Sequence, residues 1–290
     1  MPVPLIRSLF LVALAWALAL SALPAFAQSA ALAKIKRDAA MVIGYVDGAA
    51  PFSYTDAAGQ PQGYSVDLCR AVALDISAHL GIAGMKTRWV PLTAQERVEA
   101  VRSRRVDLEC GTTTWTLTRQ SAVDFSLIIF VDGANIVSLA DAQAARLGDF
   151  AGKRVAVMAG TTTEKVLRES LARTKQKSEV VTVGSRAEGM KLLEEQKVAG
   201  FASDRTTLIA AVTVLPNRAR YRLMDEDLSV EPYALMLPRD DQDFRLAVNR
   251  ALAGLYRGGG IRAIYDRSLG PLGAPSVLLN ATYFIQSLPE

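Results

Sequence analysis

The chain is poor in the residues that build metal centres and histidine-dependent active sites. Its 290 residues include two cysteines, Cys69 and Cys110, and one histidine, His79. These three residues lack the paired spacing of a zinc site, so no metal is expected. One histidine in an unsuitable position also excludes a Ser-His-Asp hydrolase. No nucleotide-binding glycine fingerprint occurs, and we expect no cofactor.

The sequence also lacks an excess of charge of one sign. Lysine and arginine number 33 against 29 aspartates and glutamates, which gives a formal net charge of +4. The two signs are interspersed, and this argues against nucleic acid or a membrane surface as the partner. Long apolar runs are missing as well, apart from one near the N-terminus, and nothing downstream resembles a transmembrane span.

That N-terminal run has the features of a secretory signal peptide. Arg7 precedes an apolar stretch over residues 9–20, and the small-residue pattern Ala-Phe-Ala ends at Ala27. The stretch is shorter than the roughly 20 residues that span a bilayer, so we expect cleavage after Ala27 and export to the periplasm. In that oxidising compartment we expect Cys69 and Cys110 to pair, the alternative being two buried thiols.

A short phrase occurs twice in the exported part. Residues 106–114 and residues 155–163 each run from an apolar stretch into Gly-Thr-Thr-Thr, and Arg119 and Arg168 follow them. Each phrase predicts a strand, a glycine turn, a row of hydroxyls and the start of a helix. Helix starts offer unpaired N–H groups and a positive dipole end, so each phrase could hold an anion. The alternative is that the threonines serve only as caps and turn residues.

Strands and helices alternate along the chain, which predicts an α/β protein with largely parallel sheets. A helix is expected from Ser65 as its cap to Gly81. Two extended passages, near residues 131–139 and 230–237, bracket about one hundred residues with their own strand-helix series. We therefore expect a lobe inserted into a lobe, with a ligand cleft between them. The expected segments are a signal peptide (1–27), lobe 1 (28–135), lobe 2 (136–233), and the rest of lobe 1 with the tail (234–290).

Several motifs resemble the periplasmic solute-binding proteins of ABC importers for polar amino acids, family 3. The resemblance covers residues 42–269 and is nearest to the glutamate/aspartate-binding branch. It implies a type II periplasmic binding protein: two α/β lobes joined by two hinge strands. It also implies a monomer that binds a free amino acid and a membrane permease on a separate chain. The motifs are residues 51–54, 63–69, 107–114, 119–120, 160–164, 237–241 and 260–266.

The resemblance also implies which residues hold the ligand backbone. Arg119 corresponds to the arginine that grips the α-carboxylate, a contact suited to the fixed fork of a guanidinium. Asp204 corresponds to the carboxylate that binds the α-ammonium. A solvated surface arginine and a helix N-cap are the structural alternatives for these two residues. Further contacts are implied for four threonines, two from each lobe: Thr112, Thr114, Thr161 and Thr162.

The side-chain pocket departs from that branch. Arg97 resembles the arginine that pairs with a ligand side-chain carboxylate, the alternative being the polar face of a helix. Where the branch carries another arginine, this chain has Val46 followed by Asp47. Arg186 stands at a histidine position of the branch and could replace the missing cation, unless it points into water. An acidic ligand is expected, with a neutral polar amino acid as the alternative.

Two other classes of function share this scaffold. An exported enzyme of the cyclohexadienyl dehydratase type would need a general acid or base in the cleft. Besides Asp204, Glu164 is the nearby candidate, and its alternative role is a favourable acidic residue in the first turn of a helix. A ligand sensor would present its closed form to a separate receptor. We expect binding without transformation, and no catalytic residue.

Overall fold

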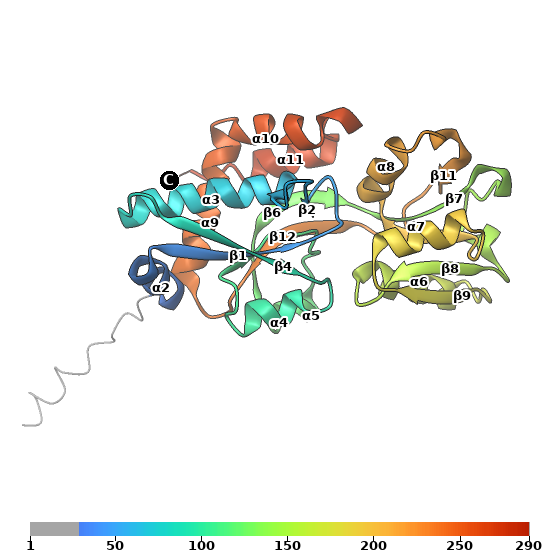
Figure 1. Cartoon of the computed structure of the whole chain (residues 1–290), viewed down its shortest axis with the longest axis horizontal. Coiled ribbons are helices and arrows are strands. Elements are labelled where there is room, and N and C mark those ends of the chain that lie inside the picture. Colours follow the sequence, from blue (N-terminus) through green and yellow to red (C-terminus); the bar gives the residue numbers. More distant parts are fainter. Residues whose placement is uncertain (1–28, 290) are drawn as a thin grey trace, which may run out of the picture.

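The computed structural model describes residues 29–289, which form two α/β lobes side by side (Figure 1). The predicted signal peptide, residues 1–27, lies outside the described residues. Within residues 29–289, no helix is long and apolar enough to cross a membrane. Each lobe is built on its own five-stranded sheet, in the strand orders β4-β1-β5-β12-β6 and β11-β7-β10-β8-β9.

The sheet of lobe 1 is mixed. Strand β1 pairs in parallel with β4 and β5, whereas β12 runs antiparallel to both β5 and β6. A small separate hairpin is formed by β2 and β3. The strands of lobe 1 are β1 (Ala40–Val46), β2 (Tyr54–Thr55), β3 (Pro61–Gln62), β4 (Lys86–Leu92), β5 (Leu108–Glu109), β6 (Asp124–Asp132) and β12 (Glu231–Leu237).

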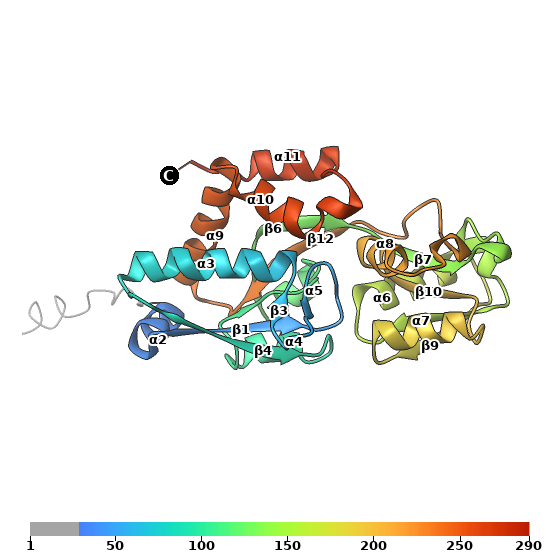
Figure 2. The same ribbon diagram turned by 45° about the horizontal axis from the view of Figure 1, so that its top comes forward.

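Helices cover both faces of this sheet. Successive side chains of a strand point to opposite faces, and β1 has apolar residues on both of them. In β1, Met41 and Ile43 enter the core beneath α3 and α9, while Val42 and Val46 pack with the residues of α4. Figure 2 shows α3, α9, α10 and α11 together on one side. The helices are α2 (Ala30–Asp38), α3 (Tyr64–Leu80), α4 (Arg97–Arg102), α5 (Leu117–Gln120), α9 (Gln242–Arg257), α10 (Gly260–Ser268) and α11 (Val277–Ile285).

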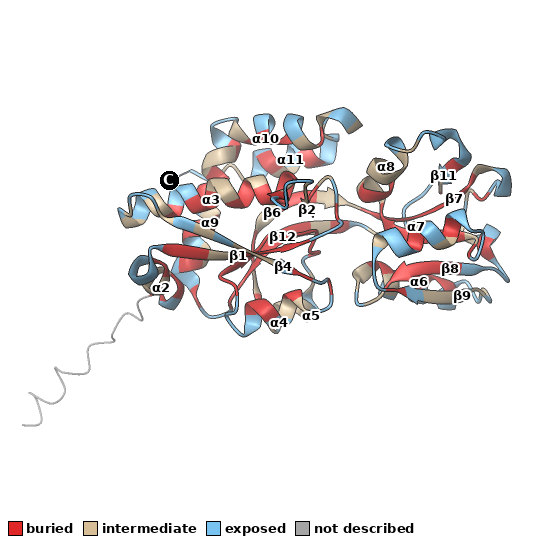
Figure 3. Cartoon of the chain, viewed as in Figure 1, coloured by how far each residue is buried: buried red, intermediate tan, exposed pale blue. Residues whose placement is uncertain are grey.

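Lobe 2 repeats this plan on a smaller scale. Strand β8 is parallel to β9 and β10, while β7 is antiparallel to β10 and β11. Helix α6 packs on one face, and α7 and α8 pack on the other. The central strands of both lobes are largely buried, whereas the edge strands β4 and β9 and the outer helix faces are more exposed (Figure 3). The elements are β7 (Ala134–Leu139), β8 (Arg154–Met158), β9 (Glu179–Val183), β10 (Gly200–Asp204), β11 (Tyr221–Leu223), α6 (Thr162–Arg173), α7 (Arg186–Glu194) and α8 (Arg205–Thr213).

The chain crosses between the lobes twice, slightly earlier than the expected boundaries at residues 135 and 233. The first crossing is Gly133, between β6 and β7, and the second lies at residues 229–230, directly before β12, because Leu228 still packs against the lobe 2 core. Strand β12 runs through Pro232 without a break. Its neighbours Glu231 and Tyr233 pair with residues of β6, which keeps the strand extended.

The start of α3 differs from the prediction. The helix begins at Tyr64, with Gly63 in the cap position, and Ser65 is buried inside the first turn. Gly63 has a φ of 117°, and a Cβ there would lie 2.4 Å from the Phe52 carbonyl oxygen. The glycine therefore fixes this turn, since other residues would clash and be strained. The predicted stop is confirmed, because Gly81 ends the helix with a φ of 67°.

The two Gly-Thr-Thr-Thr phrases fold differently, so the expectation of a helix start after each was wrong for the first one. After β5 the threonines stay extended, and Thr114 bridges to Tyr233 of β12. The short helix α5 begins only later, with Thr116 as its N-cap. The second phrase is as predicted: Thr161 caps α6 by accepting a hydrogen bond from the backbone N–H of Glu164.

The two cysteines are joined in a disulfide bond, with their Cα atoms 6.4 Å apart. Cys69 lies on α3 and Cys110 directly follows β5. The bond therefore ties the long helix of lobe 1 to the strand that leads into the first threonine row.

Candidate functional site

The lobes touch one another where their parallel strands end. Three hydrogen bonds between the lobes lie near the two threonine phrases, with lengths of 3.0–3.4 Å. In α/β sheets, ligands bind outside the carboxyl ends of the strands, so this region is the candidate site. The three pairs are Gln95 Nε2 with the Ala159 carbonyl, Thr114 Oγ1 with Thr162 Oγ1, and Arg186 Nη2 with Thr112 Oγ1.

Arg97 points into this region and not along a polar helix face. Its side chain is buried, and Nη1 donates to the Thr112 carbonyl over 3.4 Å. Its Nε has no partner among the described residues. Its neighbours Glu96 and Glu99 instead pair with arginines on the outer surface. Burial lowers the pKa of the Arg97 guanidinium, and the nearby Glu109 carboxylate acts in the opposite direction.

Arg119 is also turned inward, although it lies on a short exposed helix. Its Nη1 donates to the Thr114 carbonyl at 2.9 Å. Burial, together with the charge of Arg97, lowers the pKa of this guanidinium to about 10. It is still protonated at neutral pH. The charges of Glu109, Glu231 and Asp204 partly offset this lowering of the pKa. Two neighbouring guanidinium groups attract an anionic ligand.

Asp204 and Arg186 form an ion pair inside lobe 2, with Nη2 and Oδ2 3.1 Å apart. Asp204 occupies the N-cap position of α8, but its side chain makes no capping hydrogen bond. It is therefore available to a ligand. The Arg186 side chain is 13% exposed, so it does not project into water, and its Nε has no partner within residues 29–289. Because Arg186 also contacts Thr112, it spans both lobes.

The first turn of α8 is capped from the other lobe, by a residue that was not predicted from the sequence. Asp132, at the end of β6, accepts hydrogen bonds from Thr206 Oγ1 at 3.0 Å and from the Thr206 backbone N–H. Tyr233 donates to the same carboxylate over 3.3 Å. Burial, with the charge of Asp204, raises the pKa of Asp132 to about 7. This carboxyl group therefore titrates near neutral pH at the hinge.

Two buried glutamates were also missed. Glu231, on β12, accepts hydrogen bonds from Thr114 and from Ser229. Glu109 is completely buried on β5 and accepts from Thr113 Oγ1 at 2.9 Å. Burial raises the pKa of Glu109. A signal was present in the sequence, since a carboxylate inside an apolar strand needs partners to be tolerated.

The second phrase contributes less to the cleft than expected. The Thr161 hydroxyl donates to the Met158 carbonyl and caps α6, while Thr162 reaches Thr114 across the cleft. Glu164, the candidate acid of the enzyme alternative, accepts from the Gly160 N–H and pairs with Arg168 over 3.0 Å. Its carboxylate is therefore directed to its own helix and turn.

Val46, which stands where the glutamate/aspartate-binding branch has an arginine, lies in an apolar environment. Val46 is buried and packs with the residues around α4. Asp47 is exposed, and its carboxylate accepts from two backbone N–H groups of the adjoining turn. Phe52, in the turn after Asp47, is completely buried in a cluster of rings in lobe 1 and does not wall the cleft.

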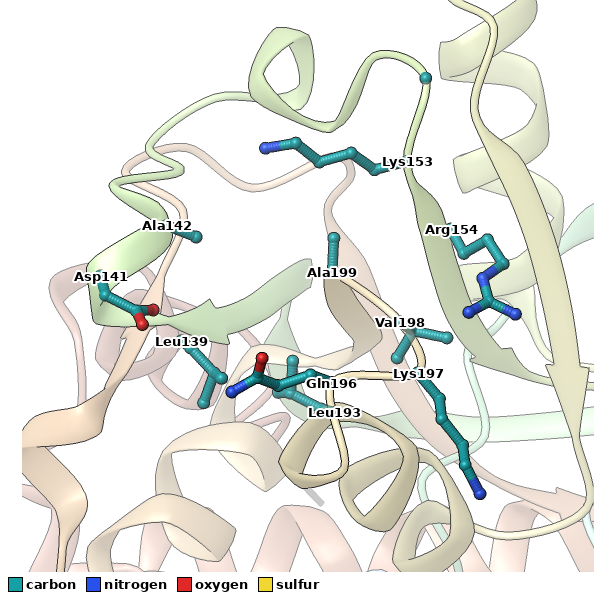
Figure 4. A pocket seen from close by; sticks show the side chains of 11 residues that line it. Leu139, Asp141, Ala142, Lys153, Arg154, Leu193, Gln196, Lys197, Val198 and Ala199 are labelled. Carbon is teal, nitrogen blue, oxygen red and sulfur yellow. The ribbon is translucent and has the colours of Figure 1, made fainter.

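Two cavities of similar size differ in their relation to this site. One of about 410 Å³ opens between the lobes, and Arg186 lines it together with Pro51, Tyr54 and Met190. The other, of about 390 Å³, lies at the opposite end of the lobe 2 sheet. Its basic side chains point in different directions, so they do not converge on one anion (Figure 4). These are Lys153, Arg154 and Lys197.

The chain matches known proteins over most of its length. The family model for bacterial extracellular solute-binding proteins, family 3, matches residues 41–271. The L-glutamate/L-aspartate-binding protein of Pseudomonas aeruginosa is 31% identical over 237 residues, covering 81% of this chain and 78% of that protein. The glutamate/aspartate import solute-binding protein of Escherichia coli is 27% identical over 257 residues, covering 87% and 85%.

A solved structure extends the comparison to the fold. The solute receptor for L-cysteine of Neisseria gonorrhoeae superposes with a TM-score of 0.74 at 26% identity, covering 83% of this chain and 94% of that one. The expected type II periplasmic binding protein fold is confirmed. By its sequence match and its two-lobed structure, the chain belongs to the bacterial extracellular solute-binding proteins of family 3.

Proposed function

We propose that this protein is exported to the periplasm, captures a free acidic amino acid in the cleft as a monomer, and delivers it to an ABC importer. The observation that carries the proposal is the meeting of three arginines with Asp204 at the junction of the lobes. The named relatives from Pseudomonas aeruginosa and Escherichia coli, which bind or import glutamate and aspartate, support the same ligand class.

Each charged group of such a ligand has a matching partner. Arg119 takes the α-carboxylate through its two-pronged fork. Asp204 takes the α-ammonium, which competes with Arg186 for the same carboxylate. Thr112 and Thr114 add hydroxyl or carbonyl contacts from lobe 1, and Thr161 and Thr162 provide the opposite wall.

The ligand's second carboxylate is bound by Arg97 and Arg186. Both side chains keep a buried Nε without a partner among residues 29–289, so each has a donor left for an anion. A buried carboxylate needs such paired charges, because desolvation otherwise outweighs its attraction. The two arginines come from different lobes, and Arg186 replaces the cation that is missing at Val46.

Calorimetry against the twenty common amino acids tests the proposal. We expect glutamate or aspartate to bind most tightly, and mass spectrometry to recover the ligand unchanged. A preference for a neutral amino acid would refute the acidic ligand. Chemical conversion of the bound compound would instead favour an enzyme, although the named relatives are binding proteins and Glu164 is directed away from the cleft.

A further inference from the structure

We propose that Glu109 is a positioning residue of the ligand site: it anchors the first threonine row and supplies the negative charge that Arg97 and Arg119 need before a ligand arrives. The inference deepens the proposed function and rests on it. Glu109 lies in the first repeated phrase, where the second phrase has Met158. Both phrases lead into the same Gly-Thr-Thr-Thr sequence, so the Gly-Thr-Thr-Thr turn itself does not require a glutamate at this position.

The anchor acts through the alternation of side chains in an extended segment. Thr112 and Thr114 reach across to lobe 2, where their hydroxyls contact Arg186 and Thr162. Thr113, between them, points the other way and donates to Glu109 Oε2 at 2.9 Å. Holding Thr113 in place therefore keeps its two neighbours directed into the cleft.

The negative charge of Glu109 acts on the two arginines without accepting a hydrogen bond from either of them. No hydrogen bond joins Glu109 to either guanidinium among the described residues, yet its charge raises the pKa of both against the effect of burial. Its Oε1 is buried with no partner within residues 29–289. Glu109 thus offsets the buried positive charge, while Arg97 Nε stays available to a ligand.

The neighbouring residues leave room for this carboxylate. A Cβ at Gly111 would lie 2.3 Å from Glu109 Oε1, so a side chain at that position would displace it. The same Cβ would meet a Val46 methyl group at 3.2 Å. Oε1 of Glu109 therefore lies beside the backbone of Gly111, while Oε2 accepts the hydrogen bond from Thr113. The charge of Glu109 acts on both Arg97 and Arg119.

A substitution that removes the charge and keeps the shape separates the charge role of Glu109 from simple packing. Glu109→Gln keeps an acceptor for Thr113 and removes the negative charge that opposes an incoming carboxylate. We expect the ratio of glutamate affinity to glutamine affinity to rise roughly threefold or more. Asp107→Asn is the matched control, because Asp107 is a buried carboxylate nearby that pairs with Lys34 and not with the cleft. It should leave the ratio unchanged. An unchanged ratio in Glu109→Gln would overturn the charge role.

A second variant tests the anchoring role of Glu109. Thr113→Val removes the donor to Glu109 and keeps every charge, so it should weaken glutamate and glutamine alike with an unchanged ratio. Equal affinity to wild type, in a folded protein, would overturn the anchoring role. Both titrations are compared with wild type, so a wild-type protein that binds neither ligand marks a failure of the proposed function and not of Glu109.

A double-mutant cycle tests the charge role without any ligand. Thermal unfolding is measured for Glu109→Gln, Arg97→Met and the double variant. We expect the double variant to lose less stability than the two single losses added together, because the second substitution removes a charge that has already lost its partner. The same cycle with Asp107→Asn should be additive. Additivity with Glu109, or a double variant that fails to fold when Arg97→Met alone folds, contradicts the proposal. If Glu109→Gln alone fails to fold and the double variant folds, the proposal is supported.

Discussion

The two lobes carry the same four-residue phrase and use it in different ways. In lobe 2, Gly-Thr-Thr-Thr follows β8 and opens α6, so Thr161 satisfies the helix start. In lobe 1 the same four residues stay extended against β12, and arginine side chains line the cleft there. The difference shows that a phrase of this length does not fix its own conformation. The surrounding structure determines the conformation. In lobe 1 the phrase pairs with strand β12, which is distant in the sequence, and in lobe 2 it begins helix α6.

The largest difference is expected between the arginines that follow the two phrases. Arg119→Lys should weaken every amino-acid ligand by about 1.5–3 kcal/mol, the worth of hydrogen bonds to a charged group. Arg168→Lys, at the corresponding place in the second phrase, should change affinity little, because Arg168 pairs with Glu164 on the surface of α6. Calorimetry with the tightest ligand measures both. Equal losses in the two variants would mean that Arg119 has no special role.

The hinge carboxyl group predicts a pH dependence that distinguishes α8 from α6. The pKa of Asp132 is raised to about 7 in the folded protein, above its ordinary value near 4. The folded state therefore binds more protons than the unfolded state between these values, and the contribution of Asp132 to stability falls as the pH rises through this window. We expect a loss of about 1–2 kcal/mol between pH 5 and pH 7 from this group.

Thermal unfolding from pH 4.5 to 7.5 measures that slope. Asp132→Asn is isosteric and does not titrate, so its unfolding temperature should vary less with pH across the window. An identical pH profile for wild type and variant would show that Asp132 has an ordinary pKa.

The smallest expected effect separates the capping roles of the threonines. Thr161→Ala should destabilise the protein by about 1 kcal/mol, because α6 loses its N-cap. Thr112→Ala removes no helix cap, so it should cost affinity and little stability. Urea unfolding and calorimetry of the two variants test this pair. A stability loss of equal size in both would contradict the different conformations of the two phrases.

Much of the fold follows from local patterns in the sequence. The alternation of strands and helices predicted two α/β lobes. Gly81 was placed correctly at the end of α3, and the start of a helix after the second threonine phrase was expected, because these signals act within a few residues. The start of α3 was not predictable in this way. It depends on the close approach of Gly63 to the backbone of Phe52, which belongs to a separate turn.

The site could be predicted in part. Arg97, Arg119, Arg186 and Asp204 were expected in one cleft, and the structure brings them together. Their binding roles remain predictions. Asp132 and Glu231 were missed because they act across long sequence separations. Glu109, which contacts Thr113 nearby in the chain, could have been found from its place inside an apolar strand. Asp132, for example, caps a helix that begins more than seventy residues later, at Arg205.

The central claim is that Arg97 and Arg186 bind a second carboxylate. Wild type and Arg97→Ala, each titrated with glutamate and with glutamine, test it most directly. The account predicts that wild type prefers glutamate, and that the variant loses about fivefold or more in affinity for glutamate beyond its loss for glutamine. A wild-type preference for glutamine, or equal losses for the two ligands in Arg97→Ala, would contradict it.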